Sequence, residues 1–264
     1  KVGYTYEDRL FGHSAYVDSF LDKHGLYVPE TGVVSWNVEV PSSGFYHIHV
    51  TYLAVEGRSS EISRGLQIDG EYPFTEAQNF VLSRIWEDEY DVAERRVDGK
   101  HDLKPKQLEK LRWNTMPIRD THGYYAGVSY QFYLEAGTRV ISFVGDREPV
   151  LIESIHFLQE EPVRSYQDVL VDHQENMVPV IGQAALGEDG YIKVQGENAY
   201  EKSSPILSPV ANWSSYLVDP YVKFLTRYNT IGGTTWRVAG DWISWEVDVP
   251  QTGLYELTFK VLQN

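Results

Sequence analysis

Several features are missing from this 264-residue sequence, and each absence excludes a kind of bond, site or segment. Cysteine is absent, which excludes disulfides and thiolate metal sites. No run of 18 apolar residues occurs, so no segment is predicted to span a membrane. Lys1 is not followed by the charged-then-apolar pattern of a signal peptide, so any such leader has been removed or lies outside this sequence.

Recognisable catalytic motifs are also missing. The sequence contains no HExxH zinc pattern, no GxSxG elbow and no GxxxxGK[ST] phosphate loop, so metalloprotease, serine hydrolase and nucleotide-binding functions lack a motif. His47 and His49 alternate as surface residues of a strand do, and a metal role for them is not expected. Carboxylates are numerous, but a glycosidase needs two at a set separation across a groove.

The chain is acidic and aromatic. Its formal net charge of −15 disfavours binding to a nucleic acid backbone. Such acidity suits a neutral glycan or a calcium ion, or it only keeps the protein soluble. Aromatic residues make up 14% of the sequence, with 19 Tyr and 7 Trp. They favour strands and flat surfaces that contact sugars.

One block of sequence occurs twice. Glu30–Tyr52 matches Gly240–Val261 without a gap, at an offset of 209 residues (245 − 36) that aligns Trp36 with Trp245. Both copies alternate apolar and polar residues on either side of a Pro-x-x-Gly turn, which predicts two half-buried antiparallel strands joined by that turn. The repeat therefore predicts two copies of one β module.

The block follows the pattern Gly-Asp, aromatic, Ile/Val, x, aromatic, x-Val-x-Val-Pro-x-x-Gly-x-Tyr. This pattern resembles the third and fourth strands of family-6 and family-35 carbohydrate-binding modules. The resemblance implies an all-β fold, a jelly-roll β-sandwich of galactose-binding-like type. Further stretches resemble large extracellular solute-binding lipoproteins of Gram-positive sugar ABC transporters, which carry paired sandwiches ahead of a ligand-capturing domain: Gly57–Ala77, Leu103–Trp113, Phe132–Phe143 and Asn229–Trp236. This implies an extracellular chain anchored at the cell surface, followed by a downstream domain.

Two modules are expected. Residues 1–160 form the first β-sandwich with a helical leader at Thr5–Gly25, and residues 161–264 form a second leader, around Ser165–Leu170, and the opening half of a second sandwich. Within the first module, residues 130–134 and 139–144 are predicted to form a hairpin. The second copy is therefore truncated after its first strands, and a free strand edge there invites pairing with another chain.

Aromatic residues near polar loops are the candidates for sugar binding, because a sugar ring packs its C–H bonds on an aromatic face while its hydroxyls need fixed donors and acceptors. The alternative is that the Trp side chains of the first module cap its core. Trp36 and Trp245 are expected in the core, since they are centred on buried-face alternation. The candidate ligand-binding residues are Arg84, Trp86, Trp113, Tyr124, Tyr125 and Trp213.

A structural calcium ion is implied by the resemblance, since these modules commonly tie the opening strand to the closing strand through one acid on each. Glu197 matches the acid of the opening strand and Glu153 that of the closing strand. They belong to different predicted modules, and neither module shows both. Calcium needs six or more oxygen ligands, so these two acids alone do not make a site.

The function expected from these observations is a non-catalytic carbohydrate-binding or accessory region of an extracellular sugar-uptake protein, with an oligosaccharide or polysaccharide as ligand. Two alternatives stay open. One is a structural or protein-interaction module without sugar binding. The other is an ancillary domain of a glycoside hydrolase.

Overall fold

The computed structural model describes residues 25–55, 57–120, 128–159, 163–176, 179–182, 186, 190–238 and 240–261. They form two compact units. The larger unit contains the described residues up to 159 together with Gly196–Ser244, and the smaller contains those from 163 to Gln195 together with Trp245 to Val261. Along the chain, the first change of unit falls between residues 159 and 163, the described residues on either side of the expected division at 160. Residues 196–244, however, group with the first module rather than the second; the division at 160 as a module boundary stays a prediction.

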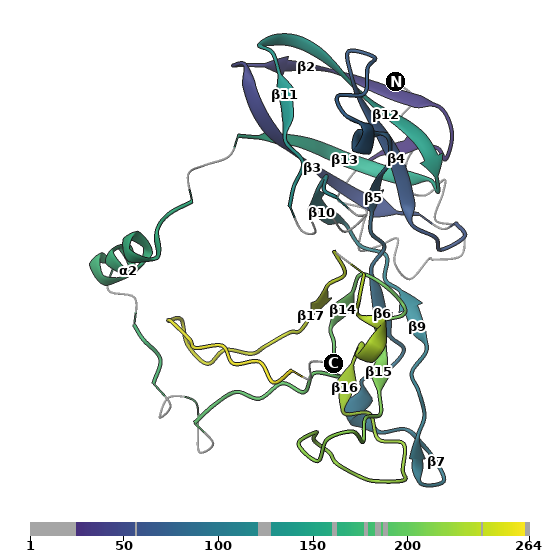
Figure 1. The fold of residues 1–264 in the computed structure, drawn as a ribbon, viewed down its shortest axis with the longest axis vertical. Coiled ribbons are helices and arrows are strands. Elements are labelled where there is room, and N and C mark those ends of the chain that lie inside the picture. The colour runs from purple at the N-terminus through teal and green to yellow at the C-terminus, as the bar shows by residue number, and fades with distance from the viewer. Residues whose placement is uncertain are drawn as a thin grey trace. The chain divides into compact units, whose positions relative to one another are not determined.

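A β-sandwich occupies the first part of the larger unit (Figure 1). One sheet has the order β1-β13-β3-β10, with β11 also paired to β3. All these pairings are antiparallel. The strands are β1 (Leu26–Val28), β13 (Val150–Leu158), β3 (Gly44–Ala54), β10 (Asn114–Pro117) and β11 (Phe132–Leu134).

The second sheet has the order β2-β12-β4-β5 and is also antiparallel. Its strands are β2 (Val33–Val40), β12 (Gly137–Arg147), β4 (Ile62–Ile68) and β5 (Phe80–Leu82). Alternate residues of both sheets meet in one core: on β3, Tyr46, Ile48, Val50 and Tyr52 are buried, while His47 and His49 between them are only partly so. The predicted all-β sandwich is confirmed.

Two connections differ from the sequence prediction. The Pro41–Gly44 turn does not join neighbouring strands of one sheet, because β2 and β3 lie in opposite sheets. Likewise, the predicted hairpin at 130–144 is wrong: both strands form, but β11 pairs with β3 and β12 pairs with β2 and β4. Two successive strands that bury one face in the same core show the same alternation whether they are neighbours in one sheet or lie in the two opposite sheets of the sandwich. The alternation alone therefore does not show which strands pair.

Trp36 packs against this core as expected, edge-on to Phe143 with 5.1 Å between ring centroids. A second, smaller cluster of buried residues contains Leu53, Val55, Leu111 and Leu151, with Tyr27 and Trp113 packed against it. Trp245 is half-buried and belongs to neither cluster of the described residues. Its expected core position is therefore not found.

Another antiparallel sheet in the larger unit combines distant parts of the sequence, in the order β17-β14-β6-β9. Its strands are β6 (Trp86–Asp88), β9 (Gln107–Glu109), β14 (Glu201–Lys202) and β17 (Ile243–Ser244). The remaining short elements are η2 (Thr75–Gln78), η3 (Val92–Glu94), β7 (Val97–Asp98), β8 (His101–Asp102), β15 (Pro209–Val210), β16 (Thr230–Ile231) and η5 (Gly233–Thr235).

The smaller unit contains the helix α2 (Tyr166–Glu175), which confirms the helical segment predicted before the second copy. Ser165 caps it by accepting a hydrogen bond from the Asp168 backbone N–H at 3.1 Å, while the Asp168 carboxylate accepts from Ser165 N–H, forming a capping box. The leader predicted at residues 5–25 lies outside the described residues, apart from Gly25. No helix in the described ranges has the length and apolarity to cross a membrane.

The repeat appears in the structure as a shared local contact. In the first copy, the Tyr46 hydroxyl donates to the Ser42 carbonyl at 2.7 Å. In the second copy, the Tyr255 hydroxyl donates to the Gln251 carbonyl at 2.6 Å, at the same offset of 209 residues (255 − 46). The two Pro-x-x-Gly turns are therefore closed in the same way.

Candidate functional site

A small pocket of about 180 Å³ lies in the larger unit. Its walls come from the loop before β4, from the segment between β5 and β6, and from the chain that follows β14 and precedes β17. Five of the twelve lining residues are serines, and the others include Trp86, Arg84, Glu61 and Asp241. Pockets that enclose a drug-sized ligand have about 300–1,000 Å³, so this one fits one ring or one chain end.

Trp86 is placed by the sheet around β6. It lies opposite Glu109 of β9 and Lys202 of β14. The Lys202 side chain is fully buried, and its ammonium group donates to Asp88 at 2.8 Å and to Gln107 at 2.6 Å. Burial lowers the pKa of Lys202, against the opposing effect of Asp88. These bonds attach β14, and with it the serines that follow, to the Trp86 strand.

A second ion-pair group holds β14 to the same scaffold. Glu201 is 3% exposed and accepts from Arg112 Nε at 2.8 Å and Nη2 at 2.5 Å, with Lys110 at 3.3 Å. Burial would raise the pKa of Glu201, but the Arg112 hydrogen bond and charge outweigh it and lower that pKa. Lys110 also pairs with Glu87 at 3.1 Å. The two-residue strand is thus fixed by charged contacts from both of its side chains.

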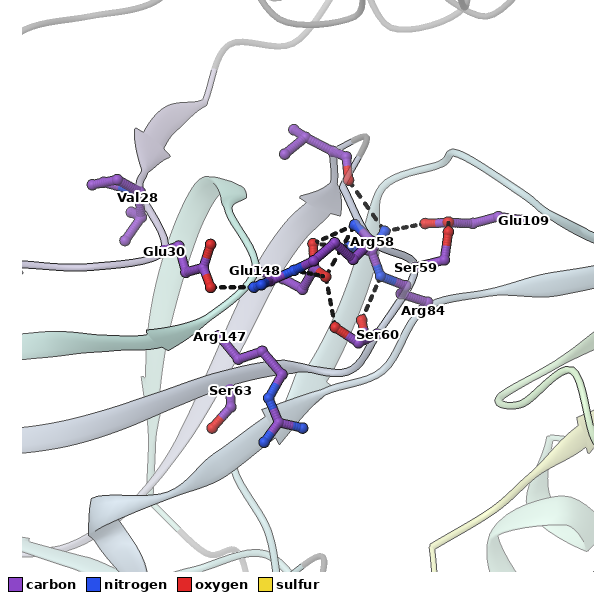
Figure 2. Close-up of polar contacts among 12 residues, drawn as sticks. Val28, Glu30, Arg58, Ser59, Ser60, Ser63, Arg84, Glu109, Arg147 and Glu148 are labelled. Carbon is purple, nitrogen blue, oxygen red and sulfur yellow. Dashed lines mark hydrogen bonds and ion pairs between the residues drawn. The ribbon is translucent and has the colours of Figure 1, made fainter.

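Arg84 lines the pocket, and only 2% of its side chain is exposed. Figure 2 shows its polar contacts. Its Nε donates to the Ser60 carbonyl at 2.7 Å, and Nη1 donates to the Val55 carbonyl at 3.1 Å and to Glu109. Its Nη2 donates to Glu148 at 3.2 Å. Arg84 therefore serves chiefly to hold the loop before β4 in place.

Glu148 lies at the centre of this network. Its carboxylate accepts from the Arg58 backbone N–H at 3.0 Å and from the Ser60 hydroxyl at 2.6 Å, as well as from Arg84. Burial would raise the pKa of Glu148, yet these hydrogen bonds and the Arg84 charge outweigh it and lower that pKa. The side chain is 1% exposed, so it acts within the fold rather than at the surface.

Asp241 supplies an acceptor to the pocket. Its Oδ1 accepts from the Ser203 hydroxyl at 2.9 Å, and that hydroxyl accepts from the Trp242 backbone N–H at 2.9 Å. Its Oδ2 is buried and has no hydrogen-bond partner within the protein. A buried oxygen of this kind costs free energy unless a donor reaches it. The pocket is thus lined by an indole-bearing residue, several serines and Asp241.

The structure brings together only part of the predicted sugar site. Trp86 and Arg84 line the pocket. Trp113 instead packs on the cluster of Leu53, Leu111 and Leu151, as the core-capping alternative held. Tyr124 and Tyr125 lie outside the described residues. Asp241 was not among the candidates, although the Gly-Asp that opens the second copy of the repeat was the sequence signal that could have found it.

Trp213 lies on a loop and is not among the residues that line the pocket. It is 44% exposed, its indole N–H donates to the Leu225 carbonyl at 3.1 Å, and its ring lies edge-on to Phe224 at 6.5 Å between centroids. Asn229 fixes the loop by donating to the carbonyls of Asn212 at 3.0 Å and Pro220 at 2.8 Å. Trp213 therefore stays a separate candidate for ligand contact.

The two predicted calcium acids occupy different environments. Glu153 is exposed on β13 and accepts from the Ser154 hydroxyl, whereas Glu197 is 5% exposed. No group of three or more His, Asp or Glu side chains suited to a metal occurs in the described part of the chain. The calcium site stays a prediction.

Comparisons with known proteins give similarity to solved structures alone, because no family model and no curated protein matches the sequence. A family 35 carbohydrate-binding module from an environmental isolate is 12% identical over 62% of this chain and 88% of its own, with a TM-score of 0.31. A family 35 module from Clostridium thermocellum is 14% identical over 50% of this chain and 73% of its own, with a TM-score of 0.27. For the Podospora anserina GH26-CBM35 β-(1,4)-mannanase the identity is 12%, over 62% of this chain and 28% of that one, with a TM-score of 0.30.

Proposed function

We propose that this chain is a non-catalytic carbohydrate-binding region and that the pocket beside Trp86 receives a sugar ring. The observation that carries the proposal is the pocket's lining by one indole, five serines and the Asp241 residue. An indole face packs against sugar C–H groups, and the hydroxyls and carboxylate match the sugar's alternating donors and acceptors.

The pocket is pre-organised, which favours binding of a small ligand. Lys202 and Glu201 fix the strand that leads to Ser203, and Arg84 with Glu148 fixes the loop that carries Ser60. Since these groups are already ordered, little conformational entropy remains to be lost when a ligand binds.

A binding function fits the carboxylates better than hydrolysis does. Glycosidases use two carboxyl groups facing each other across the scissile bond. Near the pocket, Glu109 and Glu148 are held by Arg84, and Glu61 is exposed at the rim. Asp241 alone keeps an unsatisfied buried oxygen there among the described residues.

The wider context we propose is that of an extracellular, surface-anchored sugar-uptake protein of a Gram-positive bacterium, with an oligosaccharide or polysaccharide as ligand and a downstream domain of the same protein as partner. This part rests on the sequence stretches that resemble solute-binding lipoproteins. The alternatives are a protein-interaction module and an ancillary domain of a glycoside hydrolase.

Calorimetric titration against a panel of oligosaccharides tests the proposal, with two Trp→Ala variants compared. Trp86→Ala should abolish binding while the melting temperature stays within a few degrees of the original. Trp213→Ala separates the exposed loop from the pocket, because binding lost in that variant alone would move the site to the loop. If no oligosaccharide binds the unmodified chain, the protein-interaction alternative replaces this function.

A further inference from the structure

We propose that the pocket beside Trp86 selects a sugar ring bearing a free, protonated amino group over its neutral counterpart, and rejects a ring bearing a carboxylate. This inference rests on the proposed function and names the ligand class of the same pocket. It follows from the charges of the lining residues and from which of them are already paired.

The cation that lines the pocket is not available to a ligand. Arg84 makes four hydrogen bonds to protein acceptors, and two of those acceptors are the carboxylates of Glu109 and Glu148. Two carboxylates thus contact the Arg84 guanidinium, and the Glu148 carboxylate also contacts the Arg58 side chain at 3.5 Å. An arginine that recognises an anionic sugar needs a free pair of N–H groups for bidentate contact, and this one is 2% exposed and occupied.

Two further carboxylates line the pocket. Asp241 and Glu61 are both lining residues, and Glu61 is exposed. Arg119 approaches the same segment, but its guanidinium donates to the Gly240 carbonyl at 2.8 Å and does not line the pocket. The lining therefore carries excess negative charge, which repels a uronate and attracts an ammonium group.

The remaining wall also suits a cation. An ammonium group has three N–H donors and no acceptor, so it can pair with the Asp241 carboxylate while it also donates to a serine hydroxyl of the wall. The face of an indole attracts a cation through its quadrupole, and Trp86 lines the same pocket. A neutral hydroxyl makes a hydrogen bond to a carboxylate without the charge contribution, and an acetylated amine lacks the charge as well.

The experiment compares three oligosaccharides of equal length by calorimetry at pH 6 and low salt: a β-1,4-linked glucosamine tetramer, its fully N-acetylated counterpart, and a galacturonate tetramer. We expect the glucosamine tetramer to bind at least about tenfold more tightly than the acetylated one, because its hydrogen bond to Asp241 is charge-assisted. The galacturonate tetramer should show no measurable binding.

Asp241→Asn provides the matched test, because it removes the charge and keeps the shape. It should weaken glucosamine binding about tenfold and change binding of the acetylated tetramer by less than about threefold. Asp248→Asn is the control, since Asp248 is exposed in the smaller unit and its loss removes the same charge. Because Asp241 also accepts a hydrogen bond from Ser203, melting curves must show that the variant is folded. If the variant is not folded, the order of the three affinities measured on the unmodified chain tests the inference.

Four outcomes overturn the inference. Galacturonate binding as tight as glucosamine binding, or equal affinity for the two glucosamine forms, refutes the charge selection but leaves the pocket a sugar site. A folded Asp241→Asn variant with an unchanged preference shows that Asp241 is not its source. Absence of binding by all three sugars and by the wider panel refutes the proposed function and this inference together.

Discussion

Replacing Glu148 with Gln tests whether the buried ion-pair network supports the pocket. The Glu148 side chain is 1% exposed, and every group that contacts its carboxylate is a donor: the Arg58 backbone and side chain, the Ser60 hydroxyl and the Arg84 guanidinium (Figure 2). A glutamine amide carries an NH₂ group in place of one oxygen. At least one donor would then face another donor, and Arg84 would lose one of its two carboxylates.

The magnitude follows from burial. Removing one partner of a buried ion pair costs about 3–5 kcal/mol. Arg84 keeps Glu109 as a partner and Gln keeps one acceptor oxygen, so we expect the lower end, about 3 kcal/mol. Natural domains are stable by about 5–15 kcal/mol, so this loss is a large part of the total.

Urea denaturation followed by tryptophan fluorescence measures this loss. Glu135→Gln is the matched control, because Glu135 is 66% exposed and pairs with Arg139 at the surface; such pairs contribute at most about 1 kcal/mol. An equal effect of the two substitutions, with Glu148→Gln costing less than about 1 kcal/mol, would refute the argument that the network is structural.

Acid provides an independent check on the same group. The pKa of Glu148 is lowered in the fold from its ordinary value of 4.5. The unfolded chain therefore binds a proton more readily, and the stability that Glu148 contributes is complete above about pH 4.5 and is lost as pH falls through the folded pKa. Glu148→Gln should show a shallower loss of stability below pH 4.5 than the unmodified chain.

Four further predictions concern other parts of the chain. Gly57→Ala should destabilise the fold, because a Cβ there would lie 1.9 Å from Glu148 Oε2; Gly196→Ala, with open space around it, should be nearly neutral in the same denaturation assay. Trp113→Ala should cost about 3–5 kcal/mol and leave sugar affinity unchanged by calorimetry, since its ring packs on a hydrophobic cluster. The pKa of His49 is lowered by burial and by the charges of His47 and His156. The stability contributed by neutral His49 should therefore be complete above pH 6.5 and decrease below it. Melting temperatures should decrease less below pH 6.5 for His49→Gln than for the unmodified chain or for the control His173→Gln. Hydrogen exchange should be slow in β3 and fast across residues 253–261, and equal protection of the two copies would contradict the exposure of the second.

The sandwich was predictable because its signals are local and periodic. Alternation over Phe45–Val50 of β3 specifies which residues face the core, and Ile155 and Phe157 of β13 pack on that core with the same spacing of two. The pairing was not predictable, because β11 and β12 follow one another in sequence but belong to different sheets. Which sheet a strand joins depends on the remaining strands, and no single segment contains that information.

The candidate site was predictable only in part, for a related reason. Trp86 and Arg84 stood out by type and by their polar surroundings, and they line the pocket. The opposite wall comes from Ser203 and Asp241, more than a hundred residues later. They reach Trp86 through the pairing of β14 with β6 and with β17, and two-residue strands carry no periodic signal.

A comparison of the two copies of the repeat shows which contacts the short motif forms by itself and which require partner strands. Both copies form the same tyrosine-to-carbonyl bond across their turns, so that contact needs only the motif. Burial differs: Ile48, Val50 and Tyr52 are 0–1% exposed, whereas their counterparts Leu257, Phe259 and Val261 are 71–80% exposed. At about 1.5–3 kcal/mol for each buried side chain, the second copy forgoes about 5–9 kcal/mol that the first gains from its partner strands. The opening of the second copy, Ile243–Ser244, gains its order instead by pairing with β14 in the larger unit. That pairing holds Asp241 in the unit that contains Trp86. Among the described residues, the pocket therefore combines the opening of the second copy with the unit whose sandwich contains the first copy.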